Sequence, residues 1–173
     1  GTLVGAVTGE ALVGLRYEPL YRPEEHELGW NQFSPTTGRM TVTKVARISG
    51  GIETAKASVR AQTDGLRRVI AADYVSLDDG TGIVHIAPAF GAEDYQEGKK
   101  HQLLFVQPID LRGQMAPGLP GEGKFAKQAD RDVTRDLEER GLMLKHGTIK
   151  HTYPFCWRCH TPLLYYAKPS WYI

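Results

Sequence analysis

The chain lacks most features that mark specialised classes of protein. Its 173 residues include only two cysteines, too few for a disulfide scaffold. No apolar run approaches the roughly 20 residues that a membrane-spanning helix needs. The net charge of +1 does not indicate a general affinity for nucleic acid. The length instead suits one globular domain with a hydrophobic core of its own.

The beginning of the sequence also lacks two common signals. No initiator methionine and no signal peptide precede Gly1-Thr2-Leu3. We therefore expect a fragment or a processed protein, with a cytoplasmic location. Nineteen glycines and ten prolines predict many turns, which favours a β-rich architecture over a helical bundle.

Apolar patterning predicts short strands and a few helices. Strands are expected over residues 2–7, 11–15, 40–46, 103–107 and from 142 onward, and residues 68–76 and 83–87 are expected to pair as a hairpin. Helices are expected over 92–102 and 127–140. In the second helix, the spacing predicts ion pairs of Asp132 with Arg135 and of Asp136 with Arg140, and Gly141 as the C-terminal cap. Residues 23–65 carry loop signals and form a poorly defined insertion.

The most informative stretch is GTGIVHIAPAFGAEDY, residues 80–95. It places His85 at the end of an apolar strand and Asp94 in the first turn of the next helix, where the helix dipole favours acids. Each residue alone has a structural interpretation, as a satisfied histidine or as an ordinary helix acid. Their separation of nine residues across a reversing loop favours a shared pocket.

Glycines surround these two residues. Gly80, Gly82 and Gly91 would let a ligand approach the backbone closely. Gly80 and Gly82 also suit a hairpin turn. They do not form a phosphate-binding loop, because no Gly-Lys-Ser/Thr sequence follows.

A second motif is YPFCWRCHTPLLYY, residues 153–166. Cys156 and Cys159 have the spacing of half a zinc site, and structural thiols remain an alternative. A redox pair is less favoured, because the βαβ context is missing. Residues 145–168 contain Lys, Arg and His but no Asp or Glu, so this segment either meets phosphates or forms a solvated surface.

Taken in this order, the two motifs resemble isoleucyl-tRNA synthetases. The first is similar to the signature of their editing domain, and the second to the segment where this inserted domain returns to the synthetase body. The resemblance spans most of residues 60–173. It implies a mixed α/β, mainly β fold: a β-barrel-like editing domain with peripheral helices over 1–150, followed by the return segment over 151–173.

The resemblance also implies roles for individual residues. Asp94 would bind the α-ammonium group of a mischarged amino acid, and His85 would line the pocket near the terminal adenosine of the tRNA. The rest of the substrate site would comprise Gly82, Ala89, Phe90 and Gly91. A carboxylate suits this task because it forms charge-assisted hydrogen bonds that hold the ester in place.

The implied reaction is hydrolytic proofreading of valine on isoleucine tRNA, and potentially of valyl-adenylate, within an ATP-dependent ligase. The partners would be the 3′ end of this tRNA and the rest of the synthetase, with no membrane. Editing itself would need no cofactor. Zinc would belong to the parent enzyme, where Cys156 and Cys159 would be joined by ligands outside this chain.

The chain departs from the family in three signatures. The threonine-rich editing motif, the His-x-Gly-His motif and the Lys-Met-Ser-Lys-Ser motif do not occur. We therefore expect no aminoacylation by this chain, and weak or no deacylation by it alone. Two alternatives are a freestanding trans-editing deacylase and a non-catalytic zinc- or RNA-binding module.

Overall fold

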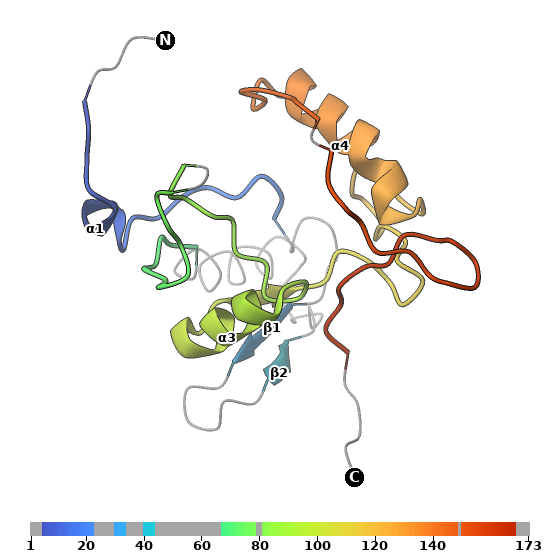
Figure 1. The fold of residues 1–173 in the computed structure, drawn as a ribbon, viewed down its shortest axis with the longest axis horizontal. Coiled ribbons are helices and arrows are strands. Elements are labelled where there is room, and N and C mark those ends of the chain that lie inside the picture. Colours follow the sequence, from blue (N-terminus) through green and yellow to red (C-terminus); the bar gives the residue numbers. More distant parts are fainter. Residues whose placement is uncertain are drawn as a thin grey trace, which may run out of the picture.

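The computed structural model describes residues 5–22, 67–78, 81–148 and 150–168, together with the backbone of 30–33 and 40–43. Figure 1 shows the arrangement of these segments. The helices and strands are, in chain order, α1 (Gly9–Leu12), β1 (Trp30–Phe33), β2 (Met40–Thr43), α3 (Ala92–His101), β3 (Leu104–Val106) and α4 (Ala126–Glu139).

The three strands form one antiparallel sheet in the order β2-β1-β3. In its register, Trp30 lies opposite Thr43 on one side and opposite Val106 on the other. Helix α3 packs beside β3, because the rings of Tyr95 and Phe105 meet edge to face with centroids 6.3 Å apart. Phe105 and Ala89 are both buried and form the centre of the core.

Helix α3 has favourable charges at both ends. Glu93 and Asp94 lie in its first turn, and Lys99, Lys100 and His101 lie in its last turn, which matches the direction of the helix dipole. The helix ends at Gln102, whose φ of 56° is left-handed. This turn directs the chain immediately into β3.

Helix α4 is amphipathic and carries the two ion pairs that the spacing predicts. Arg135 and Asp132 lie 2.9 Å apart, as do Arg140 and Asp136. A further ion pair, at 2.7 Å, joins Asp132 to Lys124 in the preceding turn. The buried face includes Ala129. Gly141, with a φ of 67°, follows the helix, as expected for a C-terminal glycine.

Several predicted elements are confirmed and others are wrong. The helices over 92–101 and 126–139 and the strands over 104–106 and 40–43 are present. Residues 83–87 and 142–146 form no strand, and residues 5–7 have no regular structure. The end of α1 and the turn after it replace the strand predicted over 11–15. Strand β1 lies within the region assigned to an insertion and has no counterpart among the predicted strands. Most of that region lies outside the described residues. Residues 2–4 and 44–46 of the predicted strands, and Gly80, also lie outside them.

The predicted hairpin is wrong because residues 67–69 have a different partner. The Val69 amide donates to the Leu15 carbonyl and the Gly14 amide donates to the Val69 carbonyl, both at 2.9 Å. An isolated antiparallel bridge joins Arg16 and Arg68. The start of the first predicted strand therefore pairs with the N-terminal segment, and no strand pairing of residues 70–76 with 83–87 is present.

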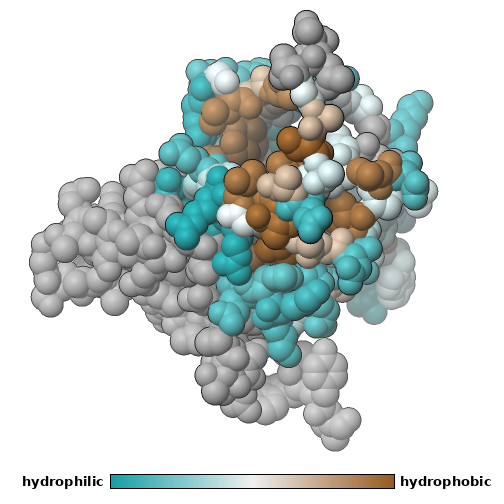
Figure 2. Space-filling view, turned by 90° about the vertical axis from the view of Figure 1, so that its left-hand side faces the viewer, coloured by the Kyte–Doolittle hydropathy of each residue, from teal (hydrophilic) through white to brown (hydrophobic). Residues whose placement is uncertain are grey.

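The face of the molecule that includes α1 is rich in apolar side chains (Figure 2). Val13 and Leu15 are exposed in the N-terminal segment, and Leu77 and Ile83 are exposed on either side of the turn near residue 80. Exposed apolar patches of this kind commonly mark interaction surfaces. No helix among the described residues is long and apolar enough to cross a membrane.

Candidate functional site

The loop between His85 and α3 is a tight, buried turn. The Phe90 amide donates to the Ala87 carbonyl at 2.8 Å, and the Tyr95 amide donates to the Gly91 carbonyl at 2.9 Å. Pro88 and Ala89 are buried within this turn. The small residues therefore form a compact backbone turn that leads directly into the first turn of α3.

The Asp94 carboxylate joins three segments of the chain. Its Oδ2 atom accepts the Ala87 amide hydrogen at 2.9 Å, and its Oδ1 atom accepts a hydrogen bond from the Tyr74 hydroxyl at 3.3 Å. Asp94 is half-buried. A Cβ atom at Gly91 would lie only 2.8 Å from Oδ2, so Gly91 allows the carboxylate to lie against the loop.

The contact with Asp94 also changes the ionisation of the Tyr74 phenol. The pKa of its phenol is raised, first by burial and then by the negative charge of Asp94 and the hydrogen bond to it. Tyr74 was not predicted as part of the site. Its sequence position, in a stretch assigned to a strand, contains no signal that it would contact Asp94.

His85 lies two residues before Ala87 but differs from Asp94 in its surroundings. Its side chain is exposed. Within the described part of the chain, no hydrogen bond reaches its imidazole.

Gly82 has a φ of 73°, and a Cβ atom there would collide with the Leu77 side chain. The turn therefore explains Gly82 without a ligand.

The loop is also held from its far side by the C-terminal segment. The Ala167 amide donates to the Ala89 carbonyl at 2.9 Å, and the Gln107 side-chain amide donates to the Ala167 carbonyl at 2.8 Å. The rings of Phe90 and Tyr166 lie 6.5 Å apart. Ala89 and Phe90 thus contact the segment that follows the C-x-x-C motif, which the sequence analysis did not predict.

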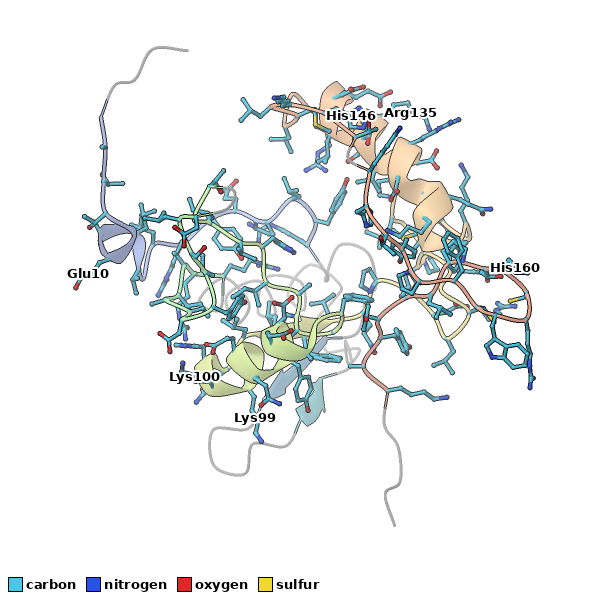
Figure 3. The ribbon with its side chains drawn as sticks, viewed as in Figure 1. Glu10, Lys99, Lys100, Arg135, His146 and His160 are labelled. Carbon is cyan, nitrogen blue, oxygen red and sulfur yellow. The ribbon has the colours of Figure 1, made fainter. Side chains whose placement is uncertain are left out.

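Cys156 and Cys159 lie on the turn that also contains His160, which is labelled in Figure 3. The Cys156 amide donates to the Thr161 carbonyl at 2.9 Å, and the His160 amide donates to the Cys156 carbonyl at the same distance. The Cys159 sulfur lies 3.2 Å from the Thr161 hydroxyl oxygen. This hydrogen bond is the main cause that lowers the pKa of the Cys159 thiol.

The turn presents two thiols of the kind that zinc prefers. Among the described residues, however, no group of three or more His, Cys, Asp or Glu side chains could hold a metal ion. The two thiols alone are fewer than the four ligands of a structural zinc site.

A separate cavity of about 530 Å³ lies between the N-terminal segment, the turn at 118–122 and α4. The Tyr21 hydroxyl on its wall donates to the Asp136 carboxylate at 2.7 Å. Arg140 pairs with the same carboxylate and also donates to the Leu20 carbonyl at 2.8 Å. None of the residues predicted for the substrate site lines this cavity.

Comparison with known proteins gives one consistent result. The chain is 43% identical over 175 residues to an isoleucine–tRNA ligase of Dehalococcoides mccartyi strain CBDB1, which covers 99% of this chain and 15% of that protein. It is 51% identical over 106 residues to the isoleucine–tRNA ligase of Streptomyces coelicolor and 49% identical over 105 residues to that of Thermus thermophilus. Each of these shorter matches covers 61% of the chain and 10% of the relative.

No family model matches the chain. The matches nevertheless agree in the protein that they name, and the longest extend over almost all 173 residues at more than 40% identity. The chain spans only about 15% of the length of the relatives that match nearly all of it. It therefore belongs to the isoleucine–tRNA ligases, as a fragment of such an enzyme.

Proposed function

We propose that this fragment is the editing part of its ligase and hydrolyses the ester that links valine to isoleucine tRNA. The same site would take valyl-adenylate as a second substrate. The proposed fold is the β-barrel-like editing domain, with α3 and α4 as peripheral helices. The proposed partners are the 3′ end of the tRNA and the rest of the ligase. We propose that the rest of the ligase packs against the exposed apolar face beside α1.

The observation that supports this proposal most strongly is the position of the Asp94 carboxylate. It lies half-buried against the turn at 87–91 and accepts two hydrogen bonds. A carboxylate has about four lone-pair sites, so it retains capacity for a cationic ligand. The α-ammonium group of an aminoacyl ester is a donor of the right charge, and its hydrogen bonds to a carboxylate are charge-assisted.

The proposed chemistry needs Asp94 as a clamp and not as a nucleophile. With the ammonium held, the adjacent ester carbonyl is fixed where a water molecule can attack it. The new bond joins the water oxygen to the carbonyl carbon, and the bond from this carbon to the ribose oxygen breaks. One proton of the water passes to the ribose oxygen, the other is released to solvent, and valine leaves as a carboxylate. His85 is exposed and is available to orient the terminal ribose or the water.

The choice of valine would rest on exclusion by size. A cup that admits the smaller side chain and rejects isoleucine would hydrolyse the wrong product and spare the correct one. Phe90 and Gly91 are proposed to contribute to this cup together with Gly82, and Ala89, which is buried in the core, to support the turn that carries them. The close contact of Gly91 with Asp94 means that a larger side chain there would disturb the clamp directly.

The test is deacylation of valine-charged isoleucine tRNA by the full-length ligase that carries this segment. We expect Asp94→Ala to lower the deacylation rate about ten- to hundredfold, the range expected for loss of a hydrogen bond to a charged group. Aminoacylation with isoleucine should be retained. Glu93→Ala is the matched control, because Glu93 is an exposed acid in the same helical turn. Unchanged deacylation by Asp94→Ala would refute the proposal.

The same assay on this chain alone addresses the freestanding alternative. We expect weak or no turnover. Rapid deacylation by the isolated chain, lost in Asp94→Ala, would indicate that it acts without the rest of the ligase.

The C-x-x-C turn favours a second candidate function, a zinc-binding module that supports the ligase structurally. Two thiols on one turn would serve as part of a zinc-ligand set in the parent enzyme. When bound, zinc would fasten this turn to the segment that supplies its other ligands. Metal analysis of the full-length ligase should show zinc that is reduced in Cys159→Ser, whereas unchanged zinc content would exclude this role for Cys159.

A further inference from the structure

We infer that Tyr74 is a positioning residue for Asp94, whose hydroxyl holds the carboxylate in the orientation that receives an α-ammonium group. This inference rests on the proposed function. It adds a residue from a segment that the site motif, residues 80–95, does not include.

The geometry provides two anchors for one carboxylate. The Ala87 amide holds Oδ2 at 2.9 Å and the Tyr74 hydroxyl holds Oδ1 at 3.3 Å. With a single anchor, a carboxylate can rotate about the bond to its Cβ atom. Donors on both oxygens, from two separate segments, oppose that rotation and set the direction in which the remaining lone pairs point.

The contact leaves room for a ligand. Two of about four lone-pair sites are used, so an ammonium group can bind without displacing Tyr74. The phenol is an uncharged donor across the neutral range, because a tyrosine ordinarily titrates near 10.0 and burial and the Asp94 charge raise this pKa further. It therefore orients the carboxylate without neutralising it, which a lysine or arginine in its place would do.

Tyr74 has little part in the core. The residue is 42% exposed, and the side chains that pack against the buried pair Ala89 and Phe105 are those of Phe90, Tyr95 and Ala167. The hydroxyl can therefore be removed by Tyr74→Phe while the ring is kept. Tyr165→Phe is a matched control, because Tyr165 is also exposed and no hydrogen bond of its hydroxyl is found among the described residues.

The first experiment measures the contact itself on this chain. The phenol of Tyr74 is titrated by NMR in the original chain and in Asp94→Asn. We expect the pKa of Tyr74 to fall toward its ordinary value in Asp94→Asn, because the neighbouring negative charge is gone. An unchanged pKa of Tyr74 in a folded Asp94→Asn variant would overturn the inference.

The second experiment measures the consequence for ligand binding. The probe is valinamide, which carries the α-ammonium group, and the comparison is isovaleramide, which has the same carbon skeleton without it. We expect Tyr74→Phe to raise the Kd of valinamide about three- to tenfold, the effect of one modest hydrogen bond. Binding of isovaleramide should not change, and Tyr165→Phe should bind both compounds like the original chain.

The two outcomes separate the inference from the proposed function. If Asp94→Asn weakens valinamide binding while Tyr74→Phe does not, the positioning role is wrong and the clamp stands. If the original chain binds valinamide and Asp94→Asn binds it equally well, the ammonium clamp itself is wrong. The NMR titration then still decides whether Tyr74 holds Asp94.

Discussion

At the residue scale, Tyr21 shows how one side chain connects distant parts of the chain. Its hydroxyl donates to Asp136, which lies 115 positions further along the sequence, and the Arg140 guanidinium lies over its ring at 5.2 Å. Burial, followed by the hydrogen bond to Asp136, raises the pKa of Tyr21 to about 12. The N-terminal segment is thereby attached to α4 by a neutral phenol.

This raised pKa predicts a loss of stability at high pH. The folded state holds the phenol proton more tightly than the unfolded chain, whose tyrosine titrates near 10.0. The stabilisation is therefore complete below about pH 10 and is lost as the pH rises toward about 12. Thermal unfolding measured across this range should show a steeper fall in Tm for the original chain than for Tyr21→Phe. Parallel curves would contradict the assignment, and Tyr165→Phe is a control that should follow the original chain.

The residues of the candidate site were predictable to different degrees. Asp94 was singled out because its spacing from His85 and its place in a helical first turn are local properties. The contacts of Tyr74 and Gln107 were not, because each is made with a residue on another segment. Gly82 has a local reason in its positive φ, so its presence in the motif does not require a ligand.

At the scale of elements, α4 packs closely against the turn that precedes it. Gly121 has a φ of 77°, and a Cβ atom at this position would lie 2.5 Å from the Cβ atom of buried Ala129. Gly123 has a similar φ of 72°, but a Cβ atom there would meet no atom within 4 Å. These two glycines therefore share a backbone conformation and differ in packing.

The pair predicts two different costs of substitution. Gly123→Ala should destabilise the fold by about 1 kcal/mol, through the left-handed backbone alone. Gly121→Ala pays this cost and must also displace α4, which adds about 1–3 kcal/mol for overpacking. Chemical denaturation of both variants measures the difference. Equal free energies of unfolding would show that the turn and α4 are not in close contact.

At the scale of the whole molecule, the candidate site depends on the C-terminal segment. Ala167 donates to Ala89 and accepts from Gln107, so a segment more than 70 residues away in sequence supports the turn beside Asp94. The loop that carries Cys156 and Cys159 precedes this segment directly (Figure 1). The turn beside Asp94 and the C-x-x-C turn are therefore linked through the segment that contains Ala167.

Removal of the Gln107 amide tests this support. Gln107→Met keeps a side chain of similar length and leaves the Ala167 carbonyl without its donor, at a cost of about 1–3 kcal/mol. We expect faster hydrogen exchange at the Ala167 amide, measured by NMR, with α4 unaffected. Gln128→Met is the control, because Gln128 is exposed on α4. Unchanged exchange at Ala167 would mean that Gln107 does not hold the segment.

Helices α3 and α4, the ion pairs along α4 and the glycine that follows it were determined by the sequence itself. They depend on residues three or four positions apart, and such neighbours meet in any helix. Only the tertiary structure decided that residues 67–69 pair with the N-terminal segment, that Tyr74 meets Asp94 and that Ala167 supports the loop. These contacts join segments far apart in the chain, where many partners compete and local pattern does not choose among them.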